Sequence, residues 1–200
     1  MTSDTTATPN TSARRRWLLY GLTMTPILAI ISLLAWGLIA ARGTPGGLAV
    51  NNDPGFVNTS PRQAPSFDVA TLDNGPQLTD EALRGKVVMI DFWSSWCGPC
   101  QLEAADLATV YQEFAGRPVE FLGIAIWDEP GDVIRHIQRY DVTYPNAIDD
   151  RGRIAVDFGV RGVPEKFFLN ADGQVVRKFI GPMSKDQLRR ILNELLAGQS

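Results

Sequence analysis

The segment from Asp91 to Cys100, DFWSSWCGPC, constrains the fold of this chain more than any other. It continues the apolar run Lys86–Phe92, which is suited to a strand buried on both faces. The two cysteines are separated by Gly98 and Pro99, and proline is favoured in the first turn of a helix. We therefore expect a buried strand, a short turn and a helix that opens at the cysteine pair, as in an α/β sheet.

Cys97 and Cys100 are the only cysteines of the chain, and there is a single histidine. These counts exclude a multi-disulfide scaffold and a typical zinc site, so we expect neither a metal nor another cofactor. Backbone N–H groups and the helix dipole favour a thiolate at the first cysteine, lowering its pKa from about 8.5 toward 7 or below. Cys97 is the predicted nucleophile of a redox-active disulfide with Cys100. The alternative, a structural disulfide or half a metal site, is disfavoured because so small a loop adds little stability.

The rest of the chain after residue 63 alternates short apolar runs with amphipathic stretches, which is typical of helices packed on a sheet. Asp172 and Gly173 form a turn pair that joins two antiparallel strands. Ser184 with Gln187 is a capping-box pattern that starts the last helix. The expected elements are strands over 86–92, 119–126, 166–169 and 174–180, helices over 98–115 and 184–196, and an N-terminal hairpin over 67–71 and 77–78.

Residues 17–41 contain no charged side chain, and these 25 positions exceed the roughly 20 needed to cross a bilayer core. Arg14, Arg15 and Arg16 precede this stretch and only Arg42 follows it, which predicts that the N-terminus stays in the cytoplasm. We expect a disordered cytoplasmic tail over 1–16 and a transmembrane signal-anchor helix over 17–41. A cleaved export signal is the alternative, and in both cases the following domain lies on the extracytoplasmic, periplasmic side.

Residues 42–62 are rich in glycine, proline and asparagine and lack periodicity, so we expect a flexible linker before a domain over 63–200. The chain carries 19 basic and 22 acidic residues, of which five and two lie before residue 63. The domain therefore has 14 basic and 20 acidic side chains, a net charge of −6. This acidic balance argues against nucleic-acid binding.

The motif WCGPC after an apolar strand, together with GVRGVPEKFFLNADGQVV, resembles the thioredoxin superfamily over roughly residues 63–198. The exported domain, its N-terminal extension and the extra residues before Pro164 are similar to membrane-anchored thiol-disulfide oxidoreductases of the TlpA/ResA/DsbE type, which serve cytochrome c maturation. The resemblance implies a thioredoxin-like α/β fold, a central mixed sheet flanked by helices, with an N-terminal β-hairpin extension and a central insertion.

The same resemblance implies that Pro164 is cis and that its loop faces the cysteine pair, with the Val163 backbone free to pair with an extended substrate strand. Glu165 borders the substrate groove in this subgroup, although a solvated surface glutamate is the alternative. Trp96 matches an exposed aromatic platform for a partner. The expected substrate-binding residues are Trp96, Gly98, Pro99, Val163, Pro164 and Glu165.

Two acidic residues lie close to the cysteines in the sequence. Asp91 interrupts an apolar run, where an unpaired carboxylate is unfavourable, so we expect it to have a raised pKa and to accept the proton of Cys100. The alternative is a strand-end aspartate without a role. Glu103 falls one helical turn after Cys100, where it can tune the thiols and transfer protons, or is simply an acid in an early helical turn.

These observations predict an enzyme, an extracytoplasmic protein disulfide reductase that uses the Cys97/Cys100 dithiol. The resemblance implies the oxidised C-x-x-C-H motif of apocytochrome c as substrate and a membrane thiol-disulfide electron donor as partner. A disulfide oxidant or isomerase is the first alternative, although Gly98 and Pro99 match the reducing thioredoxin dipeptide. A non-redox binding or chaperone module that uses the Pro164 groove is the second.

Overall fold

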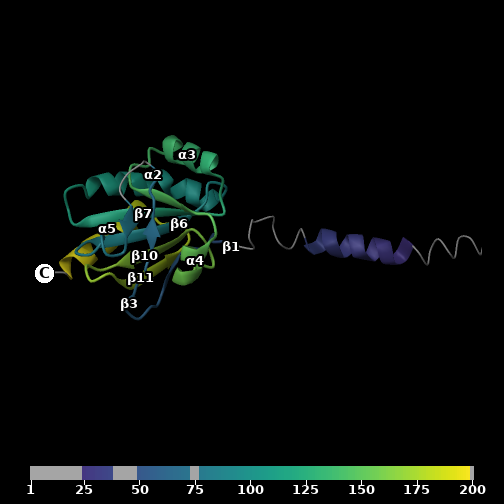
Figure 1. Cartoon of the computed structure of the whole chain (residues 1–200), viewed down its shortest axis with the longest axis horizontal. Coiled ribbons are helices and arrows are strands. Elements are labelled where there is room, and N and C mark those ends of the chain that lie inside the picture. The colour runs from purple at the N-terminus through teal and green to yellow at the C-terminus, as the bar shows by residue number, and fades with distance from the viewer. Residues whose placement is uncertain (1–23, 38–48, 73–76, 199–200) are drawn as a thin grey trace, which may run out of the picture. The chain divides into compact units, whose positions relative to one another are not determined.

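The computed structural model describes residues 24–37, 49–72 and 77–198 (Figure 1). The chain divides into two compact units, Met1–Thr44 and Pro45–Ser200. Each unit is described by itself below.

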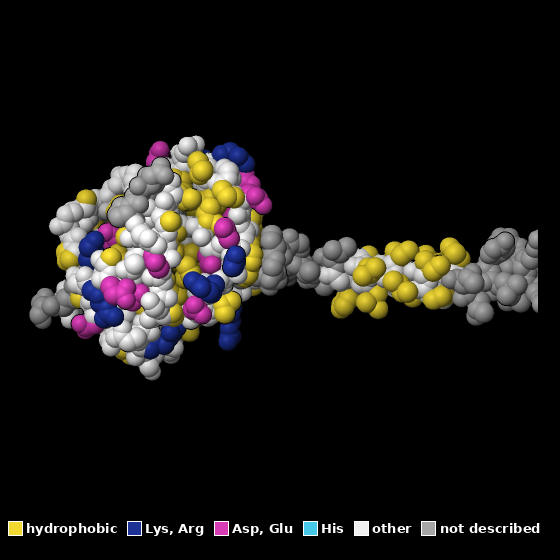
Figure 2. All heavy atoms as spheres, in the orientation of Figure 1, with side chains coloured by type: hydrophobic (Ala, Val, Ile, Leu, Met, Phe, Trp, Pro, Cys, Tyr) yellow, Lys and Arg dark blue, Asp and Glu magenta, His cyan; other side chains and the backbone are white. Residues whose placement is uncertain are grey.

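The described part of the first unit is a helix over residues 24–37. Its large apolar side chains are exposed, as the hydrophobic spheres along this helix show (Figure 2). Among the described residues, no helix is both long enough and apolar enough to cross a membrane. The predicted tail over 1–16 and both ends of the predicted span over 17–41 lie outside the described residues.

The second unit is built on a mixed sheet with the strand order β2-β11-β10-β6-β7-β8, and β3 also pairs with β11. Strands β6, β7 and β8 run parallel, whereas β10 and β11 are antiparallel to their neighbours. This arrangement confirms the predicted thioredoxin-like α/β fold. The strands span Gly55–Val57 (β2), Arg62–Gln63 (β3), Val87–Trp93 (β6), Val119–Ile126 (β7), Asn146–Asp149 (β8), Glu165–Leu169 (β10) and Gln174–Ile180 (β11).

Helices cover both faces of the sheet, which explains why β6 is apolar at almost every position. Helices α2 (Gly98–Glu113) and α5 (Lys185–Ala197) pack on one face through residues such as Leu107 and Leu188. On the other face, Phe158 of α4 (Arg153–Phe158) packs with Phe67 beside the hairpin of β4 (Asp68–Val69) and β5 (Leu78–Thr79). The predicted hairpin and the Ser184 capping box are both present.

Helix α3 (Pro130–Arg139), β8 and α4 lie between β7 and the Pro164 loop, where the sequence predicts a central insertion. Strand β8 extends the sheet beside β7, parallel to it. The sequence pattern did not predict these individual elements. Strand β8 is the end strand of the sheet beyond β7.

The predicted flexible linker over 42–62 is wrong from Ala49 onward. Strand β1 (Ala49–Val50) pairs with β9 (Gly162–Val163), while β2 and β3 pair with β11. The ring of Phe56 in β2 also packs edge-on against Phe179, with centroids 5.0 Å apart. Strands of two or three residues are too short to show a periodicity in the sequence. Strands β1, β2 and β3 form because their backbones pair with the open edges of β9 and β11.

Candidate active site

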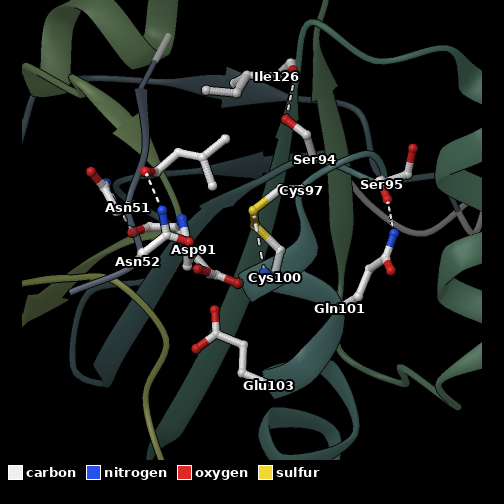
Figure 3. Close-up of a disulfide and its surroundings, with 12 residues drawn as sticks. Asn51, Asn52, Asp91, Ser94, Ser95, Cys97, Cys100, Gln101, Glu103 and Ile126 are labelled. Atoms are coloured by element: carbon white, nitrogen blue, oxygen red, sulfur yellow. Dashed lines mark hydrogen bonds between the residues drawn. A yellow bond between two sulfur atoms is a disulfide. The ribbon is translucent and has the colours of Figure 1, made fainter. Parts of the chain in front are cut away.

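Cys97 and Cys100 form a disulfide at the N-terminus of α2 (Figure 3). Cys97 is the N-cap residue, and its Sγ accepts a hydrogen bond from the Cys100 backbone N–H at 3.2 Å. A backbone donor and the positive end of the helix dipole at this sulfur favour a thiolate after reduction. Both residues are buried, with exposed fractions of 0% for Cys97 and 3% for Cys100.

Hydrogen bonds join the loop before the disulfide to the residues that follow β7. The Asp128 carboxylate accepts hydrogen bonds from the backbone N–H and the hydroxyl of Ser95, the latter at 2.7 Å. Trp96 donates its indole N–H to the Trp127 carbonyl at 3.0 Å, and its side chain is half-buried. No sequence pattern predicts this role of Asp128, because the amino-acid sequence alone does not show that the end of β7 meets this loop.

Asp91 and Glu103 meet a third charged residue, Lys166, in the interior. Asp91 of β6 lies directly opposite Lys166 of β10 in the antiparallel ladder, and Lys166 Nζ is 3.1 Å from Asp91 Oδ1. The same Nζ is 2.5 Å from Glu103 Oε1, while Glu103 Oε2 accepts the Met183 backbone N–H at 2.6 Å. Figure 3 shows both carboxylates on the Cys100 side of the disulfide. Asp91, Glu103 and Lys166 are called the buried charge cluster below.

The pKa of every member of the buried charge cluster is shifted upward, by burial for the two carboxyl groups and by their charges for Lys166. Desolvation raises the pKa of Glu103 to about 8, against the opposing effect of Lys166. Desolvation also raises the pKa of Asp91, again opposed by Lys166. Burial alone would lower the pKa of Lys166, but the two carboxylates outweigh it and raise that pKa. Two carboxylates thus share one ammonium, and the cluster can take up a proton near neutral pH.

A small cavity connects the buried charge cluster to the disulfide. Asp91 and Cys100 both line it, together with Trp93, His136 and Tyr144, and its volume is about 10 Å³. That volume is close to the minimum that holds one water molecule. Asp91 and Cys100 therefore border the same small space, which has room for about one water molecule.

Glu165 lies on the opposite face of the sheet from Lys166, as expected for consecutive residues of a strand. Its carboxylate pairs with Lys178 Nζ at 2.6 Å and accepts the Arg161 backbone N–H at 3.2 Å. The side chain is fully buried, so the alternative of a solvated surface glutamate is wrong. The carboxylate holds the loop around Pro164, and it does not face an open groove.

The other expected site residues surround the same disulfide. The Val163–Pro164 peptide bond is cis, as expected, and Val163 is fully buried. Gly98 is exposed and Pro99 is half-buried in the first turn of α2. Lys166 was missed, although one signal pointed to it: it is a charged residue beside the apolar run of its strand, and a buried charge needs a partner.

A C-x-x-C disulfide at the start of a helix, placed after a buried strand of a thioredoxin-like sheet, defines a thiol-disulfide oxidoreductase. The model of the AhpC/TSA family matches residues 61–178, and the chain belongs to this family of the thioredoxin superfamily. Its relatives are the thiol-disulfide oxidoreductases named ResA, DsbE and HelX.

Individual relatives show how far the similarity extends. A thiol:disulfide interchange protein DsbE homolog of Paracoccus denitrificans is 35% identical over 158 residues, which are 76% of this chain and 86% of that protein. The thiol-disulfide oxidoreductase ResA of Bacillus cereus is 31% identical over 134 residues, 67% of this chain and 77% of the relative. A thiol:disulfide interchange protein from Chlorobium tepidum has a crystal structure that covers 70% of this chain and 99% of its own, with a TM-score of 0.63 and 29% identity.

Proposed function

We propose that this thiol-disulfide oxidoreductase works as a reductant on the extracytoplasmic side of a membrane, with the oxidised C-x-x-C-H motif of apocytochrome c as its substrate. The observation that carries the mechanism is the buried charge cluster, which lies behind Cys100 and can take up the proton that this thiol must lose. The Gly98-Pro99 dipeptide supports the reductive direction. The haem-binding motif as substrate is supported by the resemblance to the cytochrome c maturation subgroup.

The reaction begins with the reduced protein. The Cys97 thiolate attacks one sulfur of the partner disulfide, so that the partner S–S bond breaks, a mixed disulfide forms and the other partner sulfur leaves as a thiolate. The Cys100 thiolate then attacks Cys97 Sγ and forms the Cys97–Cys100 disulfide, and the second partner sulfur leaves. Two electrons pass from the enzyme dithiol to the partner, whose two thiolates take up protons.

The second step depends on where the proton of Cys100 goes. Asp91 and Cys100 line the same cavity, and one water there can carry the proton from the thiol to the Asp91 carboxylate. The Lys166 charge at 3.1 Å opposes the rise in the pKa of Asp91 that burial causes, and it opposes the rise in the pKa of Glu103, which burial raises to about 8. In this account Asp91 is the proton acceptor, and Lys166 and Glu103 are positioning residues.

The helix over residues 24–37 supports attachment to a membrane. Its exposed apolar side chains fit a lipid environment, and the Arg14–Arg16 cluster before it favours a cytoplasmic N-terminus. The catalytic unit then lies outside the cytoplasm, where a reductant must be recharged. A membrane thiol-disulfide electron donor fits this requirement, because it delivers reducing equivalents at the surface to which the protein is attached.

An oxidised C-x-x-C-H peptide tests the proposal. We expect the reduced full-length protein to reduce the peptide, and Cys97→Ser to abolish this activity. Cys100→Ser should accumulate a mixed disulfide between Cys97 and the peptide, because the resolving thiol is missing. Faster oxidation of the reduced peptide by the disulfide form than reduction by the dithiol form would contradict the proposal and favour the oxidant alternative.

A further inference from the structure

Strand β1 lies along the strand that leads into the cis proline. It pairs with β9 in parallel, with the Ala49 backbone N–H donating to the Arg161 carbonyl at 3.3 Å. The Asn51 N–H donates to the Val163 carbonyl at 2.7 Å, and the Asn51 side-chain amide donates to the Pro164 carbonyl at 3.3 Å. The Val163 carbonyl, which was expected to pair with a substrate strand, is therefore already paired with the chain's own segment.

The approach of β1 to β9 is unusually close at Gly162. A Cβ atom at this position would lie 2.4 Å from the Ala49 carbonyl oxygen and 3.0 Å from Nδ2 of the Asn51 side chain. Only a residue without a side chain allows such a contact with the backbone of a second strand. The absence of a side chain at Gly162 thus allows an extended peptide to pair closely with the edge of β9.

The same segment also packs against the apolar core that contains the disulfide. Val50 of β1 packs against the apolar cluster that contains Cys97 and Cys100, and Cys97 has no exposed surface. Figure 3 draws Asn51 and Asn52 among the residues that surround the disulfide. Disulfide exchange requires an attacking sulfur to reach a sulfur of the bond, so a fully covered Cys97 cannot exchange with a partner protein until something moves.

We propose that residues 49–51 are an internal occupant of the β9 edge, and that an extended segment of the partner protein replaces them by strand addition before exchange. The proposal rests on the reductase function above, and it describes how the substrate gains access to the disulfide. The partner is a peptide with an extended backbone next to its cysteine, because the edge offers the backbone groups of Arg161 and Val163.

The strength of this occupancy follows from its contacts. An occupant in the same chain competes at an effective concentration in the millimolar range. Besides the two ladder pairs, two backbone hydrogen bonds and the Asn51 side-chain hydrogen bond hold the segment beside β9 and Pro164, and each is individually weak, so we expect the exchange to be reversible. A partner that binds only the form in which β1 has left β9 has an apparent affinity equal to its intrinsic affinity multiplied by the fraction of that form. We expect the resulting loss of affinity to be about tenfold.

Two variants of the full-length protein separate the pairing of residues 49–51 with β9 from effects of the Asn51 side chain. Asn51→Pro removes the N–H that donates to Val163, whereas Asn51→Ala keeps it and removes only the side-chain amide. The first readout is the rate at which dithiothreitol reduces the oxidised protein, since this small reductant needs no strand pairing. We expect about a tenfold faster rate for Asn51→Pro than for the wild type, and less than a twofold change for Asn51→Ala.

The second readout is the KM for an oxidised C-x-x-C-H peptide, which should fall about tenfold in Asn51→Pro with little change in kcat. Equal dithiothreitol rates and equal KM values in all three proteins would overturn the proposal while leaving the reductase function intact. Failure of all three to reduce the peptide would instead contradict the function, and the dithiothreitol comparison would still decide the question of occupancy.

Amide hydrogen exchange gives a test that needs no destabilising variant. In Cys100→Ser joined to a C-x-x-C-H peptide by a mixed disulfide, we expect the amides of Ala49 and Asn51 to exchange at least tenfold faster than in the free protein. Unchanged protection of these two amides would show that the peptide binds without displacing β1, which would overturn the proposal.

Discussion

Lys166 lies directly opposite Asp91 in the ladder between β10 and β6, and its ammonium is the only cation in contact with this carboxylate among the ion pairs of the described residues. It also pairs with Glu103, so that one buried cation holds two buried carboxylates. Removing one partner from a buried ion pair leaves an uncompensated charge, which the protein then neutralises by protonation. The chemistry of Cys100 therefore depends on a residue of the strand after Pro164.

We predict that Lys166→Met slows the resolving step, in which Cys100 attacks the mixed disulfide, by about 10- to 100-fold at pH 7. Without the ammonium both carboxylates stay protonated to higher pH, and neither can accept the Cys100 proton. The rate profile should shift to higher pH, which a stopped-flow pH series with an oxidised peptide would show. Lys178→Met is the matched control, since Lys178 pairs with Glu165 on the opposite face of the sheet.

Replacing Glu103 by glutamine should change how stability depends on pH. The pKa of Glu103 is raised from 4.5 to about 8 in the folded protein, so the folded state binds more protons between these values than the unfolded state. The contribution of Glu103 to stability is complete below about pH 4.5 and is lost as the pH rises to about 8.

Urea unfolding at pH 5 and pH 8.5 measures this contribution. The stability of the wild type relative to Glu103→Gln should fall by roughly 4 kcal/mol between the two pH values. A difference between the two proteins that does not vary with pH would show that Glu103 does not titrate in this range.

His136 should have the opposite effect on the pH dependence of stability, and this effect falls in the acidic range. Burial, opposed by Asp128 and aided by Arg139, lowers its pKa from 6.5 to about 4, and its ring packs 4.4 Å from that of Trp93. The unfolded state binds the proton more readily, so stability is present above pH 6.5 and is lost as the pH falls toward 4. His136→Phe should lack this loss, which we expect to be ~1–2 kcal/mol because water screens part of the effect. Parallel acid unfolding curves for the two proteins would contradict it.

Asp128 should stabilise the loop that carries Cys97. In Asp128→Ala the Ser95 N–H and hydroxyl lose their acceptor, and we expect a loss of roughly 1–3 kcal/mol together with slower formation of the mixed disulfide. The control is Asp132→Ala, which removes an exposed acid paired only with Arg135 among the ion pairs of the described residues. Urea unfolding should separate the two variants, and equal stabilities would count against this role of Asp128.

The elements near the cysteines were predictable because their signals are local. An apolar strand, a proline in the first helical turn and a capping box at Ser184 each depend on neighbours in the sequence, and all three appear in the structure. Strand β1 was not predictable, because its two residues become a strand only through pairing with β9, far along the chain. The partner of Asp91 was hidden for the same reason, since it depends on the register between β6 and β10.

The burial of Glu103 shows a further limit of sequence reasoning. Its position one turn after Cys100 was visible, but its contact with the Met183 backbone depends on how the segment before α5 crosses α2. Neighbouring residues alone cannot distinguish this glutamate from an exposed acid in an early helical turn. The role of Glu165 was hidden in the same way, because Lys178 reaches it from the adjacent strand β11.

The reduction potential of the Cys97–Cys100 pair tests the central claim most directly. The full-length protein is equilibrated with dithiothreitol buffers of known potential, and the dithiol fraction is counted after thiol alkylation. A dedicated reductant predicts a value near that of thioredoxin, about −270 mV. A value near −120 mV, as in strong disulfide-forming oxidants, would contradict the reductive function and leave the fold and the cysteine pair unchanged.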